Sequence, residues 1–191
     1  MRVIALVRDP TARALSHWNI RRRRGAEPRT FDAVAAEELA LLEAGRIAEL
    51  EAVRDEGFDD VDDDGADTDP ARTTADAARR ERAPAEAQRH GAYLVRGLYA
   101  RQLERWAAVL PRERILVVQS ERLFADPAAE LPRVWTHLGL APAPVVHPAH
   151  RNRRAYRSEP ADPATIARVR DFFRPTYADL APWLGRTPDW P

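Results

Sequence analysis

The sequence predicts an α/β fold with a parallel sheet, and two continuous apolar runs carry that prediction. One run extends from Arg2 to Val7, the other from Arg114 to Gln119, and both are rich in β-branched residues. Runs of this kind are typical of strands that are buried on both faces. Because helical patterns lie between them, we expect parallel neighbours joined through helices. Two strands make a small sheet, so we expect further strands elsewhere in the chain or in a part of the fold that precedes Met1.

The composition is that of a globular protein with an ordinary core. The chain has 191 residues, 45% of them hydrophobic, and its 30 basic and 30 acidic side chains cancel. With zero net charge, the whole molecule has no long-range electrostatic attraction to nucleic acid or to an anionic membrane. We expect neither as a partner. Every basic residue is arginine, and the chain lacks cysteine. Lysine amines, cysteine nucleophiles, thiolate zinc sites and disulfides are therefore excluded.

The apolar run near the N-terminus is too short for the core of a signal sequence. Arg8 ends it after the apolar residues Val3 to Val7, whereas a signal core needs about 7 to 15 residues. No later stretch approaches the run of about 20 apolar residues that a membrane span requires. We expect a cytoplasmic protein.

Two helices should follow the first strand. Asp9 and Pro10 predict a helix start, since Asp caps helices and Pro is favoured at the first helical position. That helix should run to about Ile20 and close at Gly25, after a cluster of arginines. Thr30 then caps a second helical segment, in which the apolar residues recur at helical spacing; they are Phe31, Val34, Leu39, Leu42 and Ile47.

An insertion of about 55–90 interrupts the helical pattern. Residues 55–69 contain nine acidic side chains and no basic one, which predicts a solvated loop. A metal site is the alternative for Asp60, Asp62 and Asp64, but the closing Glu of a calcium loop is missing. We expect no metal.

The second half of the chain contains the same kinds of helix-start and helix-end signals as the first. Apolar residues from Tyr93 to Leu110 have helical spacing, and Pro111 ends that helix. After the second strand, Asp126 and Pro127 open a helix that reaches Gly139, and Asp162 with Pro163 caps a final helix. We expect one domain over residues 1–191.

The chemistry-bearing residues lie across the first strand-to-helix junction. Ligands of open α/β sheets bind at the carboxyl ends of the strands, where Arg8 stands. Its planar fork of donors suits a phosphate, and Ser16, about 9 Å along the helix, would add a hydroxyl. The alternative is that Asp9 and Pro10 form only a helix cap, with Arg8 as a surface charge.

The string Arg8-Asp9-Pro10-x-x-Arg13-x-x-Ser16-x-Trp18 resembles the 3′-phosphate-binding motif of sulfotransferases that use 3′-phosphoadenosine-5′-phosphosulfate (PAPS). Later segments are also similar to bacterial and glycosaminoglycan-type members; they include Gly97-Leu98-Tyr99-x-x-Gln102-Leu103-x-x-Trp106, 111–118, Glu121-x-Leu123-x-x-Asp126-Pro127 and Leu138-Gly139-Leu140. The resemblance implies a P-loop-NTPase-like parallel sheet flanked by helices. It also implies PAPS as donor and sulfuryl transfer to a hydroxyl or amine of a small molecule or carbohydrate.

Carried over residue by residue, the resemblance makes Arg8 and Ser16 ligands of the 3′-phosphate. Arg153 and Arg154 lie where the family has a basic loop over the nucleotide, and Tyr99 would support the nucleotide side of the site. The alternatives are a core aromatic for Tyr99 and a solvated basic turn for residues 151–157.

The chain departs from the family pattern at the phosphosulfate loop. Members carry a K-x-G-[ST]-[ST] loop upstream of the arginine motif, and this chain has no lysine. We therefore expect an incomplete enzyme with no catalytic residue assigned, since His17 and His90 are candidates by residue type alone. A non-catalytic remnant that binds nucleotide or a partner protein is the alternative. A P-loop kinase is disfavoured because G-x-x-x-x-G-K-[ST] is absent.

Overall fold

The computed structural model describes residues 1–51, 92–145 and 160–191. Its contacts divide the chain into two compact units, one of Met1–Ala14 with Arg96–Pro191 and one of Leu15–Val95. The single domain expected over residues 1–191 stays a prediction. The insertion expected at about 55–90 lies outside the described residues.

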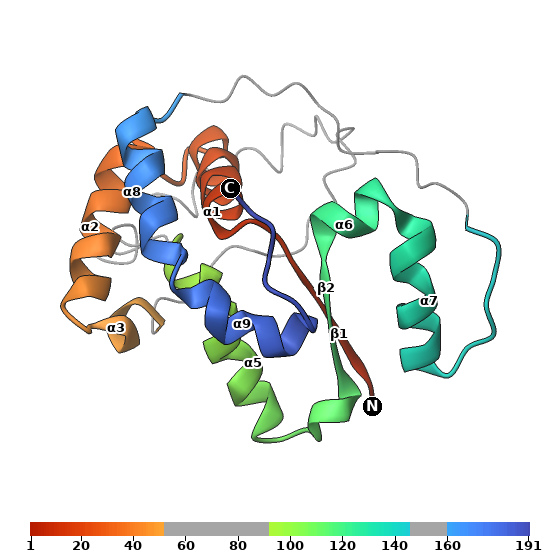
Figure 1. Cartoon of the computed structure of the whole chain (residues 1–191). Coiled ribbons are helices and arrows are strands. Elements are labelled where there is room, and N and C mark those ends of the chain that lie inside the picture. Colours follow the sequence, from red (N-terminus) through yellow and green to blue (C-terminus); the bar gives the residue numbers. More distant parts are fainter. Residues whose placement is uncertain (52–91, 146–159) are drawn as a thin grey trace, which may run out of the picture. The chain divides into compact units, whose positions relative to one another are not determined.

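A parallel pair of strands forms the centre of the first unit, as the sequence predicts (Figure 1). Strand β1 (Val3–Val7) pairs with β2 (Ile115–Gln119) in a register that runs from Val3 opposite Ile115 to Val7 opposite Gln119. Among the described residues the sheet has these two strands. Because the strands are parallel, Val7 and Gln119 bring both carboxyl ends to the same edge.

Burial on both faces is confirmed for β2 but is wrong for β1. Within β2 every residue except the half-buried Leu116 is buried, whereas in β1 only Val7 is. Leu6 is 56% exposed.

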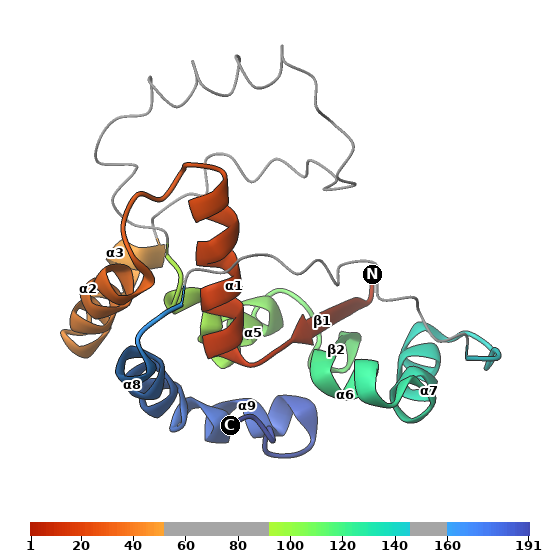
Figure 2. The ribbon, with the colours of Figure 1, turned by 90° about the horizontal axis from the view of Figure 1, so that it is seen from above.

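Helices of the first unit pack against this sheet, mainly on its second strand. They are the start of α1 (Pro10–Arg23), α5 (Tyr99–Ala107), α6 (Ser120–Ala125), α7 (Pro127–Leu138), α8 (Pro163–Phe173) and α9 (Thr176–Leu184), with short 3₁₀ turns η1 (Val95–Gly97) and η2 (Arg112–Arg114). Helices α5 and α9 lie side by side in Figures 1 and 2, and α9 also packs on β2. The core between them is apolar and contains Val117, Val118, Val169, Phe173, Leu180 and Leu184.

The predicted helix caps of this unit are confirmed. The Asp126 carboxylate accepts the Ala129 N–H at 3.1 Å, and the Asp162 carboxylate accepts the Ala164 N–H at 3.0 Å. Gly139 ends α7 in the left-handed conformation, with φ of 72°, which glycine adopts without steric cost. Helix α9 was not predicted, because Pro175 and Pro182 break the apolar pattern there.

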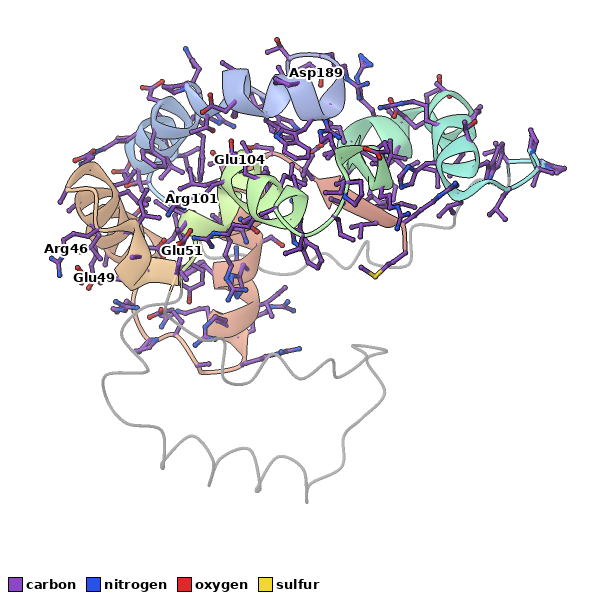
Figure 3. The ribbon with its side chains drawn as sticks, turned by 90° about the horizontal axis from the view of Figure 1, so that it is seen from below. Arg46, Glu49, Glu51, Arg101, Glu104 and Asp189 are labelled. Carbon is purple, nitrogen blue, oxygen red and sulfur yellow. The ribbon has the colours of Figure 1, made fainter. Side chains whose placement is uncertain are left out.

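The second unit is helical where it is described. It contains the rest of α1, α2 (Phe31–Glu43) and α3 (Ile47–Glu51). Thr30 caps α2 as predicted, accepting the Ala33 N–H at 3.3 Å. The segment expected to continue to Ile47 is split by Gly45, whose φ of 72° ends the helix. An exposed ion pair between Arg46 and Glu49, labelled in Figure 3, adjoins this turn.

A buried carboxylate holds the segment that returns to this unit at Ala92. Glu38, 2% exposed, accepts the backbone N–H groups of Tyr93 at 2.5 Å, Leu94 at 2.6 Å and Val95 at 3.4 Å. The helix that the sequence predicts from Tyr93 begins only at Tyr99, after the 3₁₀ turn η1.

A second buried carboxylate, Glu27, joins two segments of the same unit. It accepts hydrogen bonds from both Nε and Nη2 of Arg29 at 2.8 Å and from the Tyr93 hydroxyl at 3.0 Å. Burial alone would raise the pKa of Glu27, but the hydrogen bonds and charge of Arg29 outweigh burial, and the pKa lies below its ordinary value of 4.5.

Acid is therefore expected to destabilise the protein through Glu27. A carboxyl whose pKa is lowered in the folded state stabilises the fold above its unfolded pKa, and that stabilisation is lost as pH falls through the folded pKa. Urea unfolding, followed by circular dichroism from about pH 6 to about pH 3, measures the loss. Glu27→Gln should flatten the profile below about pH 4.5, and a variant with unchanged acid sensitivity would remove Glu27 as its source.

Candidate functional site

Polar residues gather at the carboxyl edge of the two-stranded sheet. Arg8 and Asp9 follow β1, while Ser120 and Glu121 follow β2. The Ser120 hydroxyl donates to the Val7 carbonyl at 2.9 Å and ties the two strand ends together. This edge is where open parallel sheets bind ligands.

The backbone around Arg8 is fixed from two sides. The Tyr99 hydroxyl donates to the Arg8 carbonyl at 3.0 Å, and the Asp9 N–H donates to Glu121 Oε1 at 2.8 Å. The half-buried Arg8 guanidinium makes no hydrogen bond or ion pair with any residue that the structure describes. A fixed backbone thus presents a guanidinium that is available for an anion.

The start of α1 is built as the sequence predicts. The buried Asp9 carboxylate accepts the Thr11 N–H at 2.9 Å, and Pro10 occupies the first helical position. Gly97 packs against this turn so closely that a Cβ there would lie 2.8 Å from Pro10 and 2.7 Å from the Phe173 ring. The turn that carries Arg8 therefore requires glycine at position 97.

Tyr99 supports the Arg8 turn through its hydroxyl. Burial raises the pKa of Tyr99, although the nearby positive charges of Arg13 and Arg8 oppose that shift. Its hydroxyl therefore stays protonated at neutral pH and keeps donating to the Arg8 carbonyl. The structure brings Tyr99 to Arg8, and a role of Tyr99 toward nucleotide remains a prediction.

The other predicted ligands, Ser16, Arg153 and Arg154, stay predictions. Ser16 is half-buried on α1, in the unit that begins at Leu15, while Arg8 belongs to the other unit. A phosphate held jointly by Arg8 and Ser16 thus stays a prediction. Arg153 and Arg154 lie outside the described residues.

Neither histidine candidate gains a catalytic role. His17 is buried and packs edge-on against Tyr93, with ring centroids 5.0 Å apart. This is the environment of a core side chain. His90 is not among the described residues.

Two residues of this edge were not predicted as site residues: Trp190, and Glu121, which was noted only as part of a motif shared with the family. Trp190 Nε1–H donates to Glu121 Oε2 at 3.0 Å, from the C-terminal tail. Glu121 follows the second strand as Asp9 follows the first, so the strand-end rule already pointed to it. No signal in the sequence pointed to Trp190.

Metal and membrane features are absent from the described part of the chain. Within residues 1–51, 92–145 and 160–191, no three His, Cys, Asp or Glu side chains come together as a metal site would need. Asp60, Asp62 and Asp64 lie outside these ranges. In the same ranges, no helix combines the length and apolar character needed to cross a membrane. The cytoplasmic location stays a prediction.

The family identity follows from comparison with known proteins. The sulfotransferase domain family matches residues 1–158. The chain belongs to this family, and the resemblance seen in the sequence is confirmed.

Particular relatives are heparan sulfate enzymes and a bacterial sulfotransferase. Human heparan sulfate glucosamine 3-O-sulfotransferase 5 is 31% identical over 114 residues, covering 49% of this chain and 33% of that protein. Human heparan sulfate glucosamine 3-O-sulfotransferase 3B1 is 50% identical over 44 residues, 23% of this chain and 11% of the relative. A crystal structure of a sulfotransferase from Alicyclobacillus acidocaldarius superposes with a TM-score of 0.55 at 20% identity, over 97% of this chain and 55% of that one.

These comparisons concern the fold of the chain and the share of each relative's length that it covers. The structural match confirms the predicted sulfotransferase-type α/β fold. The chain spans a third or less of the two human relatives and about half of the bacterial protein.

Proposed function

We propose that this chain binds PAPS and takes part in transfer of its sulfuryl group to an acceptor hydroxyl or amine. The observation that carries the proposal is the Arg8 guanidinium, which stands at the carboxyl edge of the sheet without a carboxylate partner in the described ranges. Family membership supports the same chemistry.

The residues at this edge fit the 3′-phosphate of the donor. A guanidinium gives a phosphate two parallel hydrogen bonds, and these are stronger than bonds between neutral groups. Arg13 adds a second positive charge beside Tyr99. We propose that Arg8 and Ser16 hold the 3′-phosphate, with Arg153 and Arg154 closing over the nucleotide and Tyr99 supporting it. Bound PAPS would supply the sulfuryl group that passes to the acceptor and leaves 3′,5′-ADP.

A carbohydrate is the acceptor class we propose, because the curated relatives are named for heparan sulfate glucosamine. A second candidate function is nucleotide binding without transfer. The described residues favour it, because the Arg8 edge offers a guanidinium for a phosphate, while His17, the histidine candidate among them, is a buried core side chain.

Calorimetry with 3′,5′-ADP and 5′-AMP tests the nucleotide site. The protein is expected to bind 3′,5′-ADP at least about tenfold more tightly than 5′-AMP, because the added phosphate gains charge-assisted hydrogen bonds. Equal affinities would contradict a 3′-phosphate site. Transfer of labelled sulfate from PAPS to a heparan sulfate oligosaccharide then separates the two functions, because the binding-only function predicts no labelled product.

A further inference from the structure

The C-terminal tail after α9 is tied down although it forms no helix or strand. Chain ends are usually poorly ordered unless specific contacts hold them. Here the Asp189 carboxylate, labelled in Figure 3, accepts hydrogen bonds from Gln119 Nε2 at 2.6 Å and from Arg122 Nε at 3.3 Å. Gln119 is the last residue of β2, so the tail is fixed to the same edge of the sheet as Arg8.

Trp190 is a residue of the tail whose side chain is buried. It is 9% exposed, and its ring lies between two tyrosines, with centroid distances of 6.2 Å to Tyr99 and 5.3 Å to Tyr177. Its Nε1–H donates to Glu121 Oε2 at 3.0 Å. The Trp190 ring thus packs against the tyrosine rings, while its N–H donates a hydrogen bond to the Glu121 carboxylate.

Two of the residues that Trp190 contacts, Glu121 and Tyr99, hold the peptide that joins Arg8 to Asp9. Glu121 uses its other oxygen to accept the Asp9 N–H at 2.8 Å, and the Tyr99 hydroxyl donates to the Arg8 carbonyl at 3.0 Å. The N–H and the carbonyl of one peptide are therefore held by Glu121 and Tyr99, two of the side chains that Trp190 contacts. Without the Trp190 N–H, Glu121 would lose the donor that orients its carboxylate.

We propose that Trp190, anchored through Asp189, is a positioning residue that fixes the Arg8 turn for binding of a 3′-phosphorylated nucleotide. The proposal rests on the proposed function, because it assigns Arg8 to the 3′-phosphate. It makes the end of the chain part of the nucleotide site without a contact to the nucleotide itself. Two parallel hydrogen bonds from a guanidinium require an accurate direction of approach, which explains why both sides of this peptide are held.

A purely structural role for Trp190 predicts a different result. In that case its replacement would lower stability, while the folded fraction would still discriminate between nucleotides with and without the 3′-phosphate. The decisive quantity is therefore the ratio of the Kd for 5′-AMP to the Kd for 3′,5′-ADP. That ratio reports the contribution of the 3′-phosphate alone.

Trp190→Phe tests the proposal, since it keeps an aromatic ring and removes the N–H. The ratio is expected to fall about fivefold, the change that one lost hydrogen bond gives. Trp183→Phe is the matched control, because Trp183 also lies near the C-terminus but stacks on Arg112, 3.9 Å from the ring centre. The control should leave the ratio unchanged, and an equal fall in both variants would overturn the proposal.

Coupling to Arg8 gives a second readout. If Trp190 acts through Arg8, Trp190→Phe should leave the ratio unchanged in a protein that already carries Arg8→Ala. A full fivefold effect in that background would overturn the proposal. Should Trp190→Phe fold poorly, Asp189→Ala removes the hydrogen bonds from Gln119 and Arg122 at a side chain that is 58% exposed, and the same ratio should fall.

Hydrogen exchange separates failure of this proposal from failure of the proposed function. The Asp9 amide should exchange faster in Trp190→Phe than in Trp183→Phe, whether or not the protein binds nucleotide, because its acceptor Glu121 has lost its donor. A parent protein that binds no 3′,5′-ADP would contradict the proposed function alone. Unchanged exchange at Asp9 would contradict the positioning role alone.

Discussion

Arg8→Ala is expected to weaken binding of 3′,5′-ADP by about 2 kcal/mol, roughly thirtyfold, while affinity for 5′-AMP stays nearly constant. The Arg8 guanidinium has no carboxylate partner in the ranges that the structure describes. Its removal should therefore cost the ligand contact without breaking an internal ion pair. Calorimetry at fixed, low ionic strength measures both affinities.

Two further variants test whether the loss of affinity is specific to the guanidinium at position 8. Arg114→Ala removes an exposed arginine at the opposite, amino end of β2, and it should leave both affinities unchanged. Arg8→Lys keeps the charge but loses the planar fork, so its affinity should lie between those of the parent and Arg8→Ala. An Arg8→Ala protein that binds 3′,5′-ADP as tightly as Arg114→Ala does would remove Arg8 from the proposed site.

Local signals in the sequence predicted the parts of the fold that depend on neighbouring residues. Asp9 caps α1 and Thr30 caps α2, because a capping side chain bonds to backbone only a few residues away. The parallel pairing of the strands also followed from their apolar runs. The burial of β1 did not, since an apolar run does not specify which elements cover it, and Leu6 is 56% exposed.

Contacts between distant segments account for what the sequence could not show. Arg8 was predicted as a ligand because a strand end and a family motif both mark it. Its supports Glu121, Tyr99 and Trp190 converge from three segments far apart in the chain. No spacing rule links Trp190 to Arg8, so only the three-dimensional structure shows that these three side chains hold the Arg8 turn.

Glu38→Ala is expected to lower the free energy of unfolding by about 3 kcal/mol, the largest effect on stability that we predict. The substitution leaves the backbone N–H groups of Tyr93, Leu94 and Val95 without the carboxylate that accepts them. Tyr93 and Leu94 are fully buried, so water cannot easily replace the lost acceptor. Alanine is a better helix former than glutamate, and the loss therefore cannot come from helix propensity. Urea unfolding measures the change.

A variant of the neighbouring Glu37 distinguishes loss of the buried hydrogen-bond acceptor at Glu38 from loss of a negative charge. Glu37→Ala, on the same helix, removes a 41% exposed carboxylate that pairs with Arg29 at 2.7 Å, and exposed pairs contribute about 0 to 1 kcal/mol. Glu38→Gln keeps one acceptor oxygen but turns an amide N–H toward backbone donors, so its cost should fall between those of the two alanine variants. If Glu38→Ala cost no more than Glu37→Ala, the segment that returns at Ala92 would be held by its apolar side chains, and the carboxylate beneath it would be dispensable.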